Sequence, residues 1–166
     1  MKGFTLVELL VVVAIIGLLS TIAAASIASA RPKARDAKRL ADMRQFASAL
    51  EHYYLLNFGY PPSSSASGMA LGVPGTSNTL SSGSGISGAC SGTCYSSIPA
   101  YPAPPVAAAC AGTFGSPTLT TPNYCYFTAS TTGNQLDFKL QFHLESTNNS
   151  YGNDDCLVTS TGIKCT

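Results

Sequence analysis

Apolar and polar residues follow three different patterns along this chain. From Phe4 to Ala30, a run of 27 residues is apolar or small and carries only one charge, Glu8. As a helix this run would be about 40 Å long, which is enough to cross a hydrocarbon core of roughly 30 Å. Its second half consists mainly of Ala and Ser, which allow helices to approach one another closely. The pattern predicts a membrane-type stem that also contacts other helices.

A helical period continues beyond the stem, but there only one face is apolar. Hydrophobic residues recur every three or four positions. They are Leu40, Met43, Phe46, Ala47, Leu50, Tyr53 and Tyr54. We therefore predict one helix from Phe4 to Tyr54, about 77 Å long and kinked by Pro32 between its two halves. Asn57 and Gly59, followed by Pro61, are helix-stop signals.

Clear strand patterns appear only towards the C-terminus. Residues 123–130 are β-branched and aromatic, residues 136–145 alternate strictly, and TTGN between them is typical of a hairpin turn. The alternation predicts one apolar face, formed by Leu136, Phe138, Leu140, Phe142 and Leu144. That face is expected to cover the apolar stripe of the helix. A last hairpin is predicted from residues 156–159 and 162–165, whereas residues 57–122 are predicted to be a loop region.

Together these patterns predict an α+β fold. A long N-terminal helix packs on a small antiparallel β-sheet with disulfide-tied loops. The predicted organisation is a leader at residues 1–3, a hydrophobic stem at 4–30 and a globular domain at 31–166. Within the domain we expect the amphipathic half-helix at 31–56, the loop region at 57–122 and the sheet at 123–166.

Charge is concentrated in one part of the chain. The net charge of +1 gives no indication of a nucleic-acid partner. Basic and acidic side chains crowd between Arg31 and Glu51, and none occurs in the 84 residues from Tyr53 to Leu136. Such a neutral segment can pack against copies of itself without electrostatic repulsion.

All six cysteines follow the stem, and an even number behind an export-type N-terminus favours disulfides. They are Cys90, Cys94, Cys110, Cys125, Cys156 and Cys165. Many pairings are possible, and the simplest joins neighbours: 90 with 94, 110 with 125 and 156 with 165. Structural zinc is disfavoured because the chain has no C-x-x-C pair and only two histidines, His52 and His143.

The N-terminal residues GFTLVELLVVVAIIGLL carry a specific motif. They join a Gly-Phe dipeptide to an acid at fixed spacing ahead of a hydrophobic run. This stretch resembles the N-terminal signature of type IV pilins and their pseudopilin relatives, and FGYPP after the helix resembles the helix-to-loop passage of that family. The resemblance covers residues 1 to about 60 and is only architectural beyond them.

The resemblance implies that a prepilin peptidase cuts between Gly3 and Phe4 and methylates the new N-terminus. It also implies a helical filament of identical subunits, held in the inner membrane before assembly and found afterwards in an extracellular pilus or a periplasmic pseudopilus. The assembly machinery and its ATPase would supply the chemistry, and the subunit's role would be mechanical and adhesive, with no cofactor. An acid inside an apolar helix costs about 3 kcal/mol to insert, so we expect Glu8 to pair with the Phe4 ammonium of a neighbouring copy. The alternative is that its side chain extends to the lipid headgroups at the membrane edge.

Two other interpretations stay open. The chain could be a major pseudopilin of type II secretion. Alternatively, residues 1–30 could be an ordinary secretory signal with ASA at 28–30 as its cleavage site, which would release a soluble binding or adhesive module starting at Arg31.

Catalytic and metal motifs are scarce. The chain has no G-x-S-x-G, H-E-x-x-H or phosphate-loop pattern, and His52 and His143 are expected to be surface residues, so we predict no enzyme. Asp154 and Asp155 lie in an oxygen-rich stretch and are weak calcium candidates. They lack the spacing of an EF-hand loop, and a polar turn is the preferred interpretation.

Overall fold

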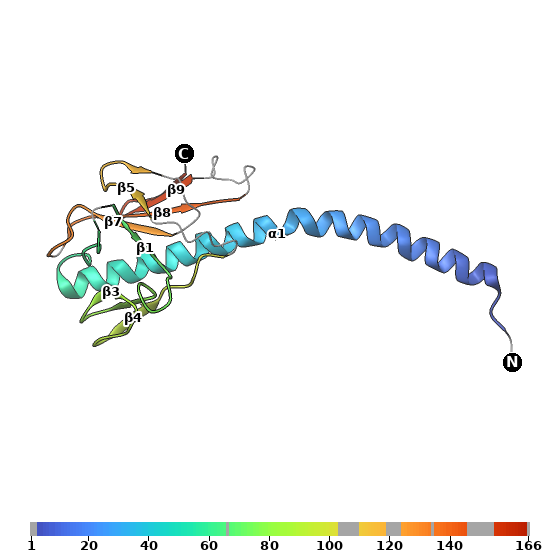
Figure 1. Cartoon of the computed structure of the whole chain (residues 1–166), viewed down its shortest axis with the longest axis horizontal. Helices are drawn as coiled ribbons and strands as arrows, with labels where there is room; N and C mark the ends of the chain where they lie inside the picture. Colours follow the sequence, from blue (N-terminus) through green and yellow to red (C-terminus); the bar gives the residue numbers. More distant parts are fainter. Residues whose placement is uncertain are drawn as a thin grey trace.

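The structure is a computed structural model that describes residues 3–65, 67–102, 110–118, 124–133, 135–145 and 155–165. One helix, α1 (Leu6–Asn57), provides the axis of the molecule. Its 52 residues span about 78 Å at the standard rise. In Figure 1 its first half projects freely, while its second half lies within a head formed by the rest of the chain.

Helix α1 begins and ends at defined caps. Thr5 is the N-cap, and Phe58 closes the C-terminus in the left-handed conformation (φ 55°), with its N–H donating to Tyr54 O at 2.8 Å. The helix starts two residues later and ends three residues later than predicted. Pro32 lies inside it without ending it, so the helix is continuous from the stem into the head.

The larger sheet has five antiparallel strands in the order β1-β7-β8-β9-β10. Their bounds are Met69–Ala70 for β1, Cys125–Thr128 for β7, Phe138–His143 for β8, Asp155–Thr159 for β9 and Gly162–Cys165 for β10. The β7–β8 pairing and the β9–β10 hairpin confirm the predicted C-terminal strands.

Two smaller sheets occupy the segment predicted as loop. The three-stranded sheet has the order β3-β2-β4, and β5 pairs with β6 in a short arm. Their bounds are Thr79–Ser81 for β2, Gly85–Ser87 for β3, Cys94–Ser97 for β4, Ala111–Gly112 for β5 and Pro117–Thr118 for β6. The loop prediction for residues 57–122 was therefore wrong at these strands and at β1, because strands of two to four residues are too short to show a period.

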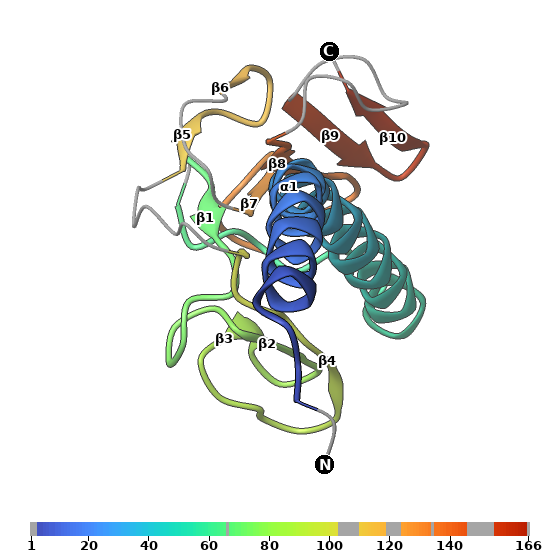
Figure 2. The same cartoon turned by 90° about the vertical axis from the view of Figure 1, so that its right-hand side faces the viewer.

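The head encloses the second half of α1 from two sides. Figures 1 and 2 show the five-stranded sheet on one side of the helix and β2, β3 and β4 on the other. The predicted helix stripe enters this core: Met43, Phe46, Leu50 and Tyr53 are buried. Facing side chains from the sheets complete the core, among them Leu80, Tyr124, Tyr126, Phe138, Leu140, Phe142 and Leu144.

The predicted alternation of residues 136–145 needs two corrections. Leu136 precedes β8 and is 81% exposed, so it does not belong to the apolar face. Gln141, on the face predicted to be polar, is buried. It lies opposite Cys125 in the β7–β8 register, and Cys125 packs with Cys110 and Phe127 in a second small cluster on that face.

Candidate assembly interface

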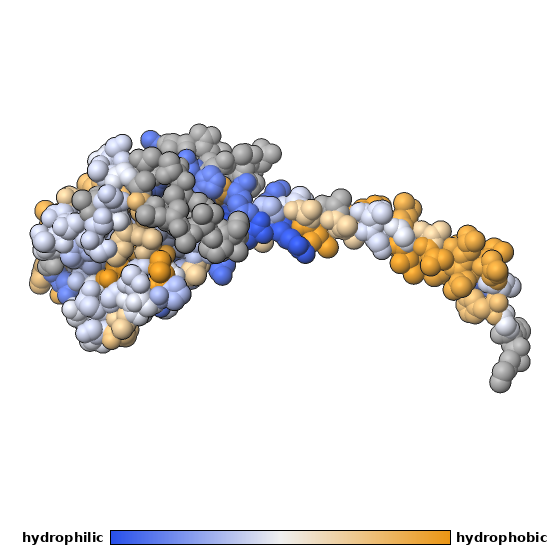
Figure 3. Space-filling view, viewed as in Figure 1, coloured by the Kyte–Doolittle hydropathy of each residue, from blue (hydrophilic) through white to orange (hydrophobic). Residues whose placement is uncertain are grey.

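The stem is the most conspicuous surface of the molecule. From residue 3 to residue 31, every side chain that the structure describes is exposed. The most apolar 18-residue stretch of α1 has a mean hydropathy of 2.6, and none of it is buried. Figure 3 shows apolar residues gathered along this part of the helix, whereas the head is mostly pale or blue. An exposed apolar surface of this size marks contact with a membrane or with other protein chains.

Hydroxyl groups in the stem do not oppose such contact, because they bond back to their own helix. Ser20 Oγ donates to Ile16 O at 2.7 Å, and Thr21 Oγ1 donates to Leu18 O at 2.8 Å. These bonds satisfy the hydroxyls inside an apolar environment. The small side chains of this half therefore leave room for a second helix to approach closely.

The first turn of the helix is closed by a reciprocal pair, Thr5 and Glu8. The Glu8 carboxylate accepts from Thr5 N at 2.8 Å and from Thr5 Oγ1 at 2.7 Å, and Glu8 N donates to Thr5 Oγ1 at 3.3 Å. This is a capping box, in which side chains satisfy backbone groups that the helix leaves unpaired. The carboxylate thus has partners within its own chain, and its pairing with the Phe4 ammonium of a neighbouring copy stays a prediction.

The predicted cleavage site lies just ahead of this cap. Gly3 and Phe4 precede the helix and are exposed, and a Cβ built at Gly3 would meet no heavy atom within 4 Å. The peptide bond between them is therefore outside regular structure and open to an enzyme.

A group of charged side chains lies where the helix enters the head. Arg39 is fully buried, and its Nη1 donates to Asp36 Oδ1 at 2.6 Å. Arg39 and Arg35 both donate to the carboxylate of Glu145, just beyond β8. Asp36 Oδ1 also accepts from the backbone N–H of Glu145 at 2.8 Å. These bonds hold the end of β8 against the first turns of the helix inside the head.

The environment of this group favours its charged state. The hydrogen bond from Arg35 holds the pKa of Glu145 below its usual value, and bonds from Arg39 add to the effect although partial burial opposes it. Arg39 also lies over the ring of Tyr101, 4.5 Å from its centroid. Burial raises the pKa of Tyr101 to about 12, so the phenol remains neutral beside these charges.

The cysteines are joined as neighbours along the chain: Cys90 with Cys94, Cys110 with Cys125 and Cys156 with Cys165. The second pair links the β5–β6 arm to β7, and the third links β9 to β10. All six cysteines are paired, so none of them is a free ligand for zinc.

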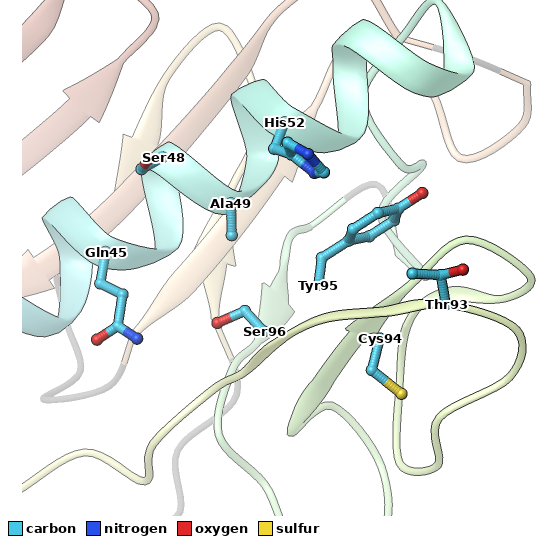
Figure 4. Close-up of a pocket in the computed structure, with 8 residues that line it drawn as sticks. All are labelled: Gln45, Ser48, Ala49, His52, Thr93, Cys94, Tyr95 and Ser96. Carbon is cyan, nitrogen blue, oxygen red and sulfur yellow. The ribbon is translucent and has the colours of Figure 1, made fainter.

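An open groove of about 470 Å³ lies between α1 and β4. Its lining, drawn in Figure 4, consists of Gln45, Ser48, Ala49, His52, Thr93, Cys94, Tyr95 and Ser96. The His52 ring meets the Tyr95 ring edge-on, with 5.3 Å between centroids, and Tyr53 packs edge-on against the same ring at 5.7 Å. Aromatic packing therefore explains the position of His52.

The structure describes one of the two calcium candidates, Asp155. Asp154 lies outside the described residues. Asp155 Oδ1 is 2.8 Å from Nδ1 of His143 across the β8–β9 pair. Among the residues that the structure describes, no three His, Cys, Asp or Glu side chains come together as metal ligands.

The described structure is thus a long N-terminal helix whose exposed apolar half projects from a small disulfide-tied head. Residues 1–24 match the family model described as the prokaryotic N-terminal methylation motif. Over 60 residues the chain is 39% identical to the type II secretion system core protein G of Pseudomonas aeruginosa, a match that covers 36% of this chain and 42% of that protein. The match thus spans well under half of that relative, and no solved structure matches the chain. Both similarities support the pilin and pseudopilin family for this chain, which confirms the resemblance of its N-terminus.

Sequence reasoning missed two features, one at the start of the stem and one where the helix enters the head. The capping box has a local signal, Thr5 followed three residues later by Glu8 ahead of an apolar run, and could have been found. The contact of Arg39 with Glu145 has no such signal, because 106 residues separate the two side chains.

Proposed function

We propose that this chain is the structural subunit of a pilus-type filament that assembles through its N-terminal helix. The observation that carries the proposal is the fully exposed apolar stem, whose start bears the methylation motif. A surface of this kind requires a bilayer before assembly and other stems afterwards. The proposed sequence runs from the inner membrane to a helical fibre, with stems in the core and heads outside.

In this proposal, prepilin peptidase removes residues 1–3 and methylates the amine of Phe4. The accessible, non-helical Gly3–Phe4 bond supports this step. Cleavage leaves a positive charge at Phe4, close to the capping box.

Glu8 then has two successive roles. In the single chain its carboxylate accepts hydrogen bonds from Thr5, which lowers the cost of keeping an acid at the edge of the membrane. In the filament it pairs with the Phe4 ammonium of a neighbouring copy. Because an ion pair in a low-dielectric core is favourable only when both charges are aligned, the pair would fix the axial register between stems.

A second candidate function is major subunit of a type II secretion pseudopilus. The similarity to the core protein G favours it. The two functions share the processing and assembly steps and differ in where the filament is found: outside the cell for a pilus, in the periplasm for a pseudopilus.

The test is to produce the whole chain together with a prepilin peptidase and a pilus-type assembly system. We expect filaments in electron micrographs of the sheared surface fraction or of ruptured cells, with this chain as their main component by mass spectrometry. Gly3→Val is the matched control, and it should leave an unprocessed membrane protein without filaments. Release of the wild-type chain as a soluble monomer would contradict the proposal.

A further inference from the structure

The head carries a second exposed apolar surface, at the end opposite the stem. Leu55 and Leu56 near the end of α1, Phe58 at its C-cap, and Leu136 before β8 are all more than half exposed. An antiparallel β-bridge between Tyr60 and Gln135 brings the two segments together. We call these four side chains, Leu55, Leu56, Phe58 and Leu136, the pole patch.

Folding of the single chain does not explain the pole patch. Phe58 adopts a left-handed backbone conformation (φ 55°) that glycine or asparagine normally occupies at a helix end. Its ring is nevertheless 83% exposed, so burial within the head does not offset the strained backbone. Exposed apolar side chains gathered at one end of a molecule mark a surface that binds another molecule.

The apolar surface that could cover it is found on the same chain. Apart from Val73, the exposed large hydrophobic residues of the described structure fall into two groups, the stem and the pole patch. The bilayer that holds a copy's own stem is out of reach, because the patch lies about 38 Å beyond Ala30 along the continuous helix. We propose that the pole patch binds the apolar stem of a second copy of this chain, shifted along the helix axis.

Helix lengths set the size of this shift. Residues 6–30 cover about 37 Å, and the patch lies about 75 Å from the start of the helix. A parallel copy displaced by about 40 to 75 Å therefore presents its stem at the level of the patch. The inference rests on the proposed filament, because only an ordered assembly holds copies at such a displacement.

Charges near the patch permit this contact. Glu51 accepts a hydrogen bond from Tyr60 Oη at 2.9 Å, and Asp137 Oδ1 accepts from Phe138 N at 2.8 Å. Both carboxylates thus have partners within the head. The facing stem has no charge between Leu9 and Ala30. The contact therefore brings no charge of the stem against Glu51 or Asp137.

The direct test places a photoreactive benzoylphenylalanine at Phe58 in the full chain and irradiates assembled filaments. We expect crosslinks from residue 58 to the N-terminal peptide that contains the stem. Such a crosslink must join two copies, because a chain's own stem is about 38 Å away. Filaments in which residue 58 links only to head peptides, or to nothing, would overturn the inference and leave the proposed function intact. If the unmodified chain forms no filament with its assembly system, the proposed function fails and the inference fails with it.

A pair of variants gives an independent readout. Phe58→Asn suits the left-handed cap and, combined with Leu136→Ser, should reduce filament yield by at least about tenfold through loss of apolar contact. Val73→Ser removes an exposed apolar side chain outside the patch and should leave the yield unchanged. The midpoint of thermal unfolding should stay near the wild-type value in both variants, since the changed side chains are exposed. Normal filament yield from the double variant would overturn the inference.

Discussion

Arg39 and Glu145 are 106 residues apart in the sequence and are joined by a hydrogen bond between a buried guanidinium and a carboxylate at the end of β8. The same carboxylate binds Arg35, one turn closer to the stem. The contact links the helix to the far end of the sheet at the level where the stem leaves the head.

We predict that Glu145→Gln destabilises the head. The substitution removes one of the two charged acceptors of Arg39, whose side chain is only 1% exposed, and leaves Asp36 as the other. Because Glu145 is itself partly exposed, the loss should be about 1–3 kcal/mol in the free energy of unfolding. Chemical denaturation of the full chain in detergent measures it. Gln45→Ala, an exposed change on the same helix, is the control and should have little effect.

The same carboxylate should make stability depend on pH. Its pKa is lower in the folded state than its ordinary value of 4.5, chiefly because of the bond from Arg35. The contribution of the Glu145 carboxylate to the free energy of unfolding is therefore fully present above pH 4.5. It is lost as the pH falls through the lower pKa that this group has in the folded state. Unfolding curves below pH 4.5 should converge for wild type and Glu145→Gln. A constant difference between them down to the lowest pH would contradict this assignment.

Substitutions at Glu8 separate charge from helix capping. Glu8→Ala should leave the thermal unfolding of the head unchanged and remove most filaments, because Glu8 is far from the core and the neighbour's ammonium loses its partner. Glu8→Asp should be intermediate, since the charge remains but reaches one methylene less. Filament yield by electron microscopy, relative to subunit level in the cell, is the measurement.

Glu8→Gln and Thr5→Val complete this series. Glutamine can still close a capping box but carries no charge, so it should assemble as poorly as alanine. Thr5→Val removes the side-chain half of the cap and keeps the acid, so it should assemble better than Glu8→Gln. Normal filaments from Glu8→Gln would show that capping, and not charge, is the function of Glu8.

We predict three disulfides in the native protein, with different energetic contributions. Closing the 15-residue loop between Cys110 and Cys125 should stabilise the folded head by about 3 kcal/mol, because it lowers the entropy of the unfolded chain. The four-residue loop between Cys90 and Cys94 should contribute about 2 kcal/mol. Variants in which both cysteines of one pair are changed to serine, compared by chemical denaturation, measure the difference in the free energy of unfolding. Alkylation without reduction should label no cysteine in native protein, and labelling of any thiol would refute the pairing.

Gly68 is required by both space and conformation. It has φ +86°, and a Cβ there would lie 2.4 Å from Cε1 of Phe127, whose ring is buried and cannot move away. Gly68→Ala should therefore cost about 2–4 kcal/mol of unfolding free energy. Gly75 has a similar φ of +74° and open space around it, so Gly75→Ala should cost only about 1 kcal/mol. Equal losses in the two variants would contradict the predicted clash.

Features with a regular period were predictable from the sequence. Met43, Phe46 and Leu50 recur at helical spacing and enter the core. The strands β7 and β8 carry aromatic and alternating residues and pair as expected. For the helix the local pattern decides both the element and its buried face, whereas for these strands it decides the element and only part of the buried face.

Features that depend on distant partners were not predictable. Strand β2 is built of Thr, Leu and Ser and has no period of its own; it is held by backbone pairing with β3 and β4 and by burial of Leu80. The exposure of Leu136 likewise depends on where β8 begins, which the alternation alone does not reveal. The short neutral strands of residues 69–118 thus follow from the tertiary fold, not from local propensity.

The N-terminus of the mature protein tests the central claim most directly. Intact-mass and fragment analysis of the chain purified from a host with prepilin peptidase should show a start at Phe4 with one added methyl group. That result is required for the ammonium that Glu8 is proposed to meet in the filament. A mature chain beginning at Arg31 would show instead that residues 1–30 are a cleaved secretory signal, and it would contradict assembly through the stem.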